Sequence, residues 1–157
     1  MLSPEAFKKI DHELTKYPAD RRQAAVMAAL HIAQEEKGWL SKETISEVAQ
    51  YLGIPDIAAL EVASFYTMYE TAPVGKHKIT VCTNISCMLR DSQGIVEHLE
   101  KRLGIGFGET TADGKFTLKE GECMGACGGA PLFLVNNTRM YELLTPEKVD
   151  EILEELK

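Results

Sequence analysis

The 157-residue chain has few cysteines and no long apolar run, and each scarcity excludes a class of protein. Its most apolar window, residues 58–69, is interrupted by Glu61 and Ser64 and falls short of the roughly 18 apolar residues of a membrane helix. We therefore expect no direct membrane insertion. The first residues also lack the apolar core of a secretory signal, and a reducing compartment disfavours stable disulfides. A disulfide framework is accordingly the weakest interpretation of the cysteines.

Basic residues are also too few for a nucleic-acid-binding surface. Seventeen Lys and Arg stand against 24 Asp and Glu, which gives a formal net charge of −7. Phosphate backbones would be repelled by such a surface, so we expect no nucleic acid partner. The chain has no G-x-G-x-x-G fingerprint after a strand and no arguable Ser/His/Asp or Cys/His set. We therefore predict no catalytic residue and no nucleotide site on this chain.

The four cysteines fall into two close pairs, Cys82-x4-Cys87 and Cys123-x3-Cys127. The second pair lies in a loop with four glycines, residues 121–129. Glycine allows the backbone to approach a ligand closely and to adopt positive φ angles. This pattern favours bringing four thiolates to one metal centre.

The spacing of the cysteines does not identify the metal. Structural zinc sites use four cysteines with gaps of about two to four intervening residues, and both pairs fit that pattern. Plant-type [2Fe–2S] sites open with the same gap as Cys82 and Cys87 but need a third cysteine where this chain has Arg90. From spacing alone, zinc and an iron–sulfur cluster both stay open.

The first half of the chain predicts a bundle of four helices. Caps, glycine stops and apolar periodicity support each of them. The expected helices run from Pro4 to about Lys16, from an Asp20 cap to Lys37, from a Ser41 cap to Leu52, and from an Asp56 cap with Leu60, Val62 and Phe65 as its apolar residues. For the aromatic segment Phe65, Tyr66, Met68 and Tyr69, core packing is favoured over an interface patch.

After residues 71–75 the pattern changes to alternating strands and helices. Strands are expected at 78–82, 115–118, 132–135 and 139–141, and helices at 92–103 and from a Thr145 cap onward. The order β-α-β-β-β-α predicts an α/β sandwich. The fold class is therefore α+β or α/β, with a helical domain over residues 1–74 and an α/β domain over residues 75–157.

Taken together, the motifs closely resemble the thioredoxin-like [2Fe–2S] subunits of bacterial NADH:quinone oxidoreductase (complex I), the NuoE family. The resemblance runs from about residue 5 to the C-terminus and departs from the family pattern at Met124 and at Gly128-Gly129. The segments that carry it are VCTNISC at 81–87, ECMGACGGAP at 122–131, EKGWL at 36–40, EVASFY at 61–66, PVG at 73–75 and TTADGKF at 110–116.

This resemblance implies an electron-transfer subunit that is not catalytic alone. It implies one [2Fe–2S] cluster held by Cys82, Cys87, Cys123 and Cys127, which exchanges single electrons with a flavin. FMN and NADH would lie on a partner, the flavin- and NADH-binding subunit, to which the helical domain docks. Other peripheral-arm subunits would be neighbours, in the cytoplasm at the inner face of the cell membrane. Position in such a fold also suggests a cis Ala130-Pro131 bond.

Two alternatives accompany this interpretation. The same module serves the diaphorase part of NAD-dependent hydrogenases and formate dehydrogenases, and a structural four-cysteine zinc adaptor belongs to a different class. If a binuclear cluster is bound, adjacency predicts that Cys82 and Cys87 share one iron, and all-thiolate ligation predicts a low potential. The expected N–H donors to the sulfurs are Gly125, Ala126, Gly128 and Gly129, whereas the carboxylate of Glu122 disfavours reduction.

Overall fold

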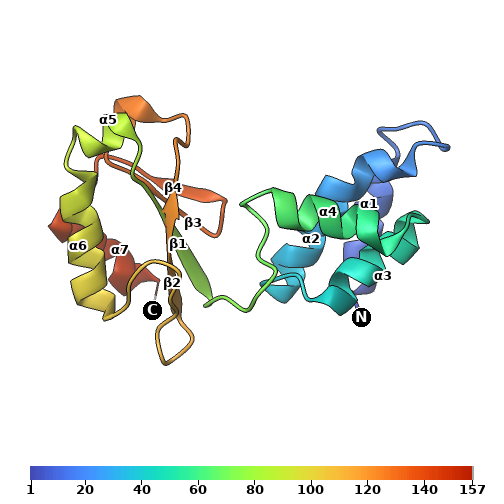
Figure 1. Ribbon diagram of the computed structural model, residues 1–157, viewed down its shortest axis with the longest axis horizontal. Helices are drawn as coiled ribbons and strands as arrows, with labels where there is room; N and C mark the ends of the chain where they lie inside the picture. Colours follow the sequence, from blue (N-terminus) through green and yellow to red (C-terminus); the bar gives the residue numbers. More distant parts are fainter. Residues whose placement is uncertain (157) are drawn as a thin grey trace. The chain divides into compact units, whose positions relative to one another are not determined.

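A computed structural model of the chain describes residues 1–156 (Figure 1). The chain divides into two compact units, Met1–Pro73 and Val74–Lys157. Helices alone form the first unit, and a four-stranded mixed sheet with helices forms the second. This mixture confirms the predicted α+β class. Among the described residues, no helix combines the length and apolar character needed to cross a membrane.

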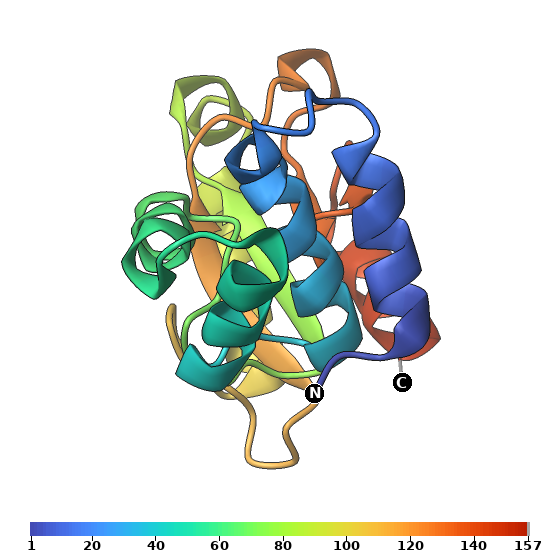
Figure 2. The ribbon, with the colours of Figure 1, turned by 90° about the vertical axis from the view of Figure 1, so that its right-hand side faces the viewer.

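Four α-helices and one 3₁₀ turn build the first unit, and its helices pack side by side in Figure 2. Their apolar faces enclose one core that includes the fully buried Ile10, Leu30, Leu40, Val48 and Leu52. The four predicted helices are therefore present. Their bounds are α1 (Pro4–Leu14), η1 (Arg22–Ala25), α2 (Val26–Lys37), α3 (Lys42–Leu52) and α4 (Asp56–Phe65).

Local signals define most helix ends in this unit. The Ser41 hydroxyl accepts the Thr44 N–H at 3.2 Å, which confirms Ser41 as the cap of α3. Gly38 and Gly53 follow α2 and α3 in the left-handed conformation, as the sequence predicts. The prediction that Asp20 caps the second helix was wrong. Residues 18–21 form a turn and a 3₁₀ turn follows, so that α2 begins only at Val26.

Helix α4 departs most from its predicted face. It buries the small residues Ala59 and Ala63, whereas Leu60 is 37% and Phe65 76% exposed. The helix is apolar on nearly all sides, so periodicity could not select the buried side. Asp56 is not its cap either: Pro55 occupies that position, and the Asp56 carboxylate accepts the Ser46 hydroxyl at 2.5 Å.

The aromatic segment after α4 is divided between core and surface. Tyr69 is buried and Met68 packs against the core, as predicted. Phe65 and Tyr66 are exposed, which contradicts core packing for these two residues. A turn follows the helix, closed by the Tyr69 N–H donating to the Tyr66 carbonyl at 3.1 Å, and only the later residues of the segment reach the core.

In the second unit the strands follow the predicted order, and the sheet runs β2-β1-β3-β4. Strands β1 and β2 are parallel, and the remaining pairs are antiparallel. The short helix α5 was not predicted, because four residues are too few for a periodic pattern. The elements are β1 (His77–Cys82), α5 (Ile85–Met88), α6 (Ser92–Leu103), β2 (Phe116–Gly121), η2 (Cys127–Gly129), β3 (Phe133–Val135), β4 (Arg139–Tyr141) and α7 (Pro146–Glu155).

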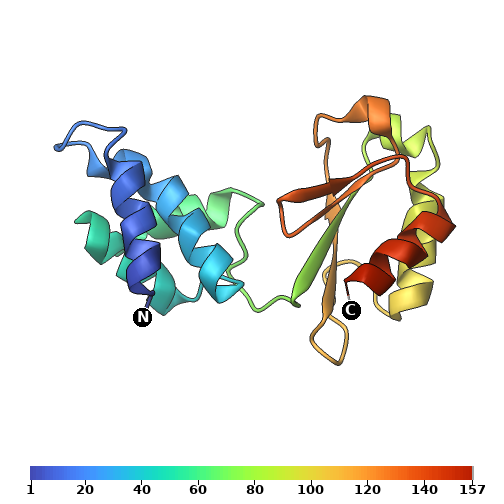
Figure 3. The same ribbon diagram turned by 180° about the vertical axis from the view of Figure 1, so that it is seen from behind.

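Helices α6 and α7 lie on one face of this sheet (Figure 3). Alternate residues of β1, Ile79 and Val81, point to that face, as the strand period of two requires. They join Phe133 of β3, Leu99 of α6 and Val149 of α7 in a core from which water is excluded. Packing against α6 and α7 thus holds one face of the sheet, and with it the ends of the strands, in place.

One turn, one cap and one peptide bond define local structure in this unit. Three residues link β3 to β4, and the first two of them, Asn136 and Asn137, have positive φ in a turn that the Thr138 N–H closes by donating to the Val135 carbonyl at 3.1 Å. Thr145 caps α7 by accepting the Lys148 N–H at 3.3 Å, and Pro146 occupies the first helical position. The Ala130-Pro131 peptide bond is cis, as its position suggested.

Candidate metal centre

The two cysteine pairs lie at the same end of the sheet because β1 and β2 are parallel. Cys82 is the last residue of β1 and is paired in register with Gly121, the last residue of β2. The segments that follow the two strands therefore both begin at the same end of the sheet. The segment after β1 carries Cys87, and the segment after β2 carries Cys123 and Cys127.

The first pair is buried. Cys82 and Cys87 are 2% and 1% exposed and form a small apolar cluster with Ala130 and Leu132. Burial raises the pKa of the Cys87 thiol to about 11, and the adjacent Cys82 thiol contributes to this rise. The Leu132 N–H donates to the Cys87 sulfur and acts in the opposite direction. Without a bound cation, Cys87 therefore keeps its proton at neutral pH.

The second pair is exposed. The sulfurs of Cys123 and Cys127 lie 3.6 Å apart, too far for a disulfide bond, and all four cysteines are free thiols. The hydroxyl of Ser86 donates to Cys127 and, with Cys123, lowers the pKa of the Cys127 thiol. The Gly125 N–H donates to the Cys123 sulfur at 3.4 Å. The Cys127 thiol therefore loses its proton more readily than an ordinary cysteine.

The two cysteine pairs interact electrostatically, because the charge of Cys127 contributes to the raised pKa of Cys87. Within residues 1–156, no three Cys, His, Asp or Glu side chains converge on a single ion position. The donor set is thus two pairs of thiols from two loops. A binuclear iron–sulfur cluster is held by four cysteine thiolates, and this donor set fits that requirement.

Glycines make the second loop possible at two positions. Gly125, between the two cysteines, has a φ of +78°, a conformation that side chains disfavour. At Gly121 a Cβ atom would lie 2.7 Å from both Thr80 Cγ2 and Met124 Cε, so a larger residue would have to displace these side chains. These two positions explain why the sequence is rich in glycine here.

The hydrogen bonds to sulfur confirm the sequence prediction only in part. Gly125 is a donor, as expected, but the Gly129 N–H donates to the Ala126 carbonyl at 2.9 Å instead. Leu132 and Ser86 were missed as donors. Ser86 directly precedes Cys87, and that adjacency was the available signal. Nothing local indicated Leu132, because its contact depends on how β3 enters the sheet.

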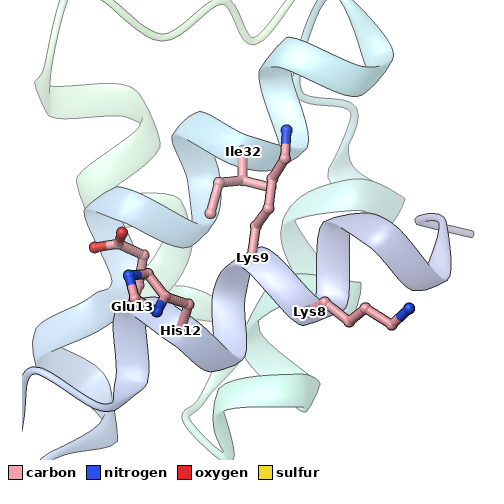
Figure 4. Close-up of a pocket in the computed structure, with 5 residues that line it drawn as sticks. All are labelled: Lys8, Lys9, His12, Glu13 and Ile32. Atoms are coloured by element: carbon pink, nitrogen blue, oxygen red, sulfur yellow. The ribbon is translucent and has the colours of Figure 1, made fainter.

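A separate hollow of about 350 Å³ lies on the first unit between α1 and α2 (Figure 4). Its side chains are Lys8, Lys9, His12, Glu13 and Ile32. Lys8 pairs with Glu5 on α1, and Glu13 pairs with Lys16 just after the end of that helix. The hollow is open to solvent, and its lining offers no thiol and no nucleophile set. It adds nothing to the metal centre.

Relatives in sequence cover nearly the whole chain. A mitochondrial NADH dehydrogenase (ubiquinone) flavoprotein 2 from Dictyostelium discoideum is 42% identical over 99% of this chain, which spans 63% of that protein. A subunit of the NADH-quinone oxidoreductase from Rickettsia conorii is 44% identical over 92% of this chain and 86% of its own. An NADH-quinone oxidoreductase subunit from Thermus thermophilus is 36% identical over 94% of this chain and 82% of its own.

The fold has a solved counterpart. An NAD⁺-reducing [NiFe]-hydrogenase in the air-oxidised state superposes with a TM-score of 0.73 over 89% of this chain and 24% of that chain, at 23% identity. The family model described as thioredoxin-like [2Fe–2S] ferredoxin matches residues 10–157. These matches agree with the pairs of free thiols at the sheet end, and the chain belongs to the thioredoxin-like [2Fe–2S] ferredoxin family.

Proposed function

We propose that this chain is the [2Fe–2S] electron-transfer subunit of an NADH:quinone oxidoreductase. The observation that carries the proposal is the donor set: four free thiols, in two pairs, at one end of a thioredoxin-like sheet. Relatives named as NADH-quinone oxidoreductase subunits share 36–44% identity over more than nine-tenths of the chain. The chain would thus contribute a redox centre to an oxidoreductase complex and would not be catalytic alone.

Cys82, Cys87, Cys123 and Cys127 would hold the cluster, which supplies a one-electron acceptor when bound. The buried pair excludes water from one side of the site, and the exposed pair leaves the other side accessible. The N–H groups of Gly125 and Leu132 donate to sulfur and stabilise negative charge there. The chain's residues therefore govern how readily an electron is accepted.

Electrons would come from a flavin on a partner subunit, which also binds NADH. Three exposed apolar residues, Ile85, Met88 and Leu89, lie in or directly after α5, the short helix that carries Cys87, and are 57–76% exposed. Leu143, 55% exposed, belongs to a segment hydrogen-bonded to Gly129 of the second loop. Because electron transfer falls steeply with distance, these apolar residues are where the flavin-binding partner would approach.

The helical unit would anchor the chain to the same partner. Helix α4 presents Ile57, Leu60 and Phe65 to solvent, and Tyr66 follows them. Contiguous apolar surface of this kind marks protein interaction sites. Docking of residues 1–74 would hold the chain in the peripheral arm, at the cytoplasmic face of the membrane, beside the other subunits of that arm.

Metal analysis with electron paramagnetic resonance tests the cofactor. Protein purified without oxygen should contain two irons and two sulfides per chain, as a binuclear cluster requires. It should be silent when oxidised and give a spin-one-half signal after dithionite. One zinc and no reducible signal would instead establish the structural zinc adaptor. Cys→Ser variants at each of the four positions then identify which pair binds each iron.

Variants of α4 test the docking proposal. Leu60→Ser combined with Phe65→Ser should weaken co-purification with the flavin-binding subunit while leaving the iron content unchanged. Tyr17→Ser is the matched control, because Tyr17 is an exposed aromatic of the same unit, 38% accessible, outside α4. Loss of iron with intact co-purification would contradict this division of roles. The hydrogenase alternative rests on likeness of fold, and co-purified subunits distinguish it.

A further inference from the structure

Two of the four residues between Cys82 and Cys87 form hydrogen bonds to the other cysteine loop that the cluster itself does not explain. The Thr83 hydroxyl donates to Glu120 Oε1 at 2.9 Å, and the Thr83 N–H donates to the Gly121 carbonyl at 3.1 Å. The Asn84 amide donates to Glu122 Oε2 at 2.7 Å. Their partners are the last residues of β2 and the residue just before Cys123.

Asn84 has a further role that fixes its orientation. Its Oδ1 atom accepts the Ile85 N–H at 2.9 Å and caps α5, while its Nδ2 atom donates to Glu122. Both ends of the amide are therefore occupied, and the amide cannot rotate without losing one bond. The start of α5, which carries Cys87, is thereby tied to the residue preceding Cys123.

We propose that Thr83 and Asn84 form a polar clasp that aligns the two cysteine pairs. The clasp joins loops that are separated by more than thirty residues in sequence, and none of its hydrogen bonds involves a cysteine sulfur.

The clasp is tested on the metal-free chain, with hydrogen exchange as the readout. Asn84→Asp keeps an oxygen that can cap α5 but replaces the amide donor with a carboxylate facing Glu122. Amides of residues 84–88 and 122–127 should then exchange several-fold faster, whereas those of α6 should not change. Exchange identical to the wild type would refute the clasp. If the wild type bound zinc and no iron, the proposed function would fail while this measurement still decided the clasp.

Discussion

Burial of Tyr69 makes the stability of the helical unit sensitive to alkaline pH. The side chain is 5% exposed, and its hydroxyl donates to the Met27 carbonyl at 2.8 Å. Burial, with a smaller contribution from Tyr66, raises its pKa from 10.0 to about 12. The folded state therefore keeps the phenol proton in a pH range where the unfolded chain has lost it.

The sign and size of the effect follow from linkage. A raised folded-state pKa gives a contribution that is complete below about pH 10 and is lost as the pH rises through about 12. At about pH 11 the unfolded phenol is mostly ionised and the folded one mostly protonated. The two titrations then differ by a factor of about ten, which lowers the free energy of unfolding by about 1.4 kcal/mol.

Tyr69→Phe isolates this term. Urea unfolding can be followed through Trp39, the single tryptophan, which lies in the same unit. At about pH 8 the variant should be less stable by about 1 kcal/mol, because the bond to Met27 is lost. Since only the wild type carries the titrating phenol, the gap should close by about pH 11. The control Tyr17→Phe alters an exposed phenol, and its curve should run parallel to the wild type.

A gap between wild type and Tyr69→Phe that stayed constant from about pH 8 to 11 would refute the reasoning. It would mean that the phenol ionises as easily in the folded unit as in the unfolded chain. Burial of Tyr69 would then be incomplete in solution, and the segment that leads to the linker would be less firmly packed than the structure indicates.

Three further predictions concern the stability of the two units. Lys37 and Ser3 lower the pKa of Glu36 to about 2, so the contribution of this carboxylate to the stability of the folded state should persist above about pH 4.5 and vanish toward pH 2. Glu36→Gln should flatten this acid dependence when unfolding is followed through Trp39, and an unchanged dependence would refute the role of Glu36. Phe133→Ala should destabilise the metal-free sheet unit by about 3–5 kcal/mol, because the ring of Phe133 is fully buried. Thermal unfolding followed by circular dichroism measures this loss, and a loss below about 1 kcal/mol would contradict the packing of the ring. Gly75→Ala should lower the free energy of unfolding by about 1–3 kcal/mol in the same assay, because the new Cβ atom would lie 2.9 Å from backbone atoms of Lys115 and Phe116. Gly128→Ala is the control and should have little effect, since no atom lies within 4 Å of the position of its Cβ. Equal losses of stability in the two variants would count against the close approach at Gly75.

Signals that act within a few residues were sufficient for much of the fold. The Ser41 and Thr145 caps, the glycines after α2 and α3, and the turn before β4 all depend on short-range hydrogen bonds and φ preferences. The β-rich run at 78–82 likewise identifies β1 as a strand. For these elements, the sequence prediction and the structure agree because no distant contact competes.

Other features depend on partners that are remote in sequence. The buried face of α4 could not be predicted, because an all-apolar helix is oriented by whichever neighbours it packs against, and here Ala59 and Ala63 permit the closest approach. Asp20 and Asp56 had the residue type of caps, but a preceding turn and the Ser46 hydroxyl removed them from that role.

The candidate site divides in the same way. By itself, the sequence determined which four thiols are available and that they come in two pairs, since this follows from residue identity and spacing. Tertiary structure alone decided that Cys82 and Cys87 are buried, that Cys123 and Cys127 are exposed, and that Ser86 and Leu132 donate to sulfur. Burial and hydrogen bonding at the site arise where β1 and β2 end side by side, and parallel pairing joins segments that are distant along the chain.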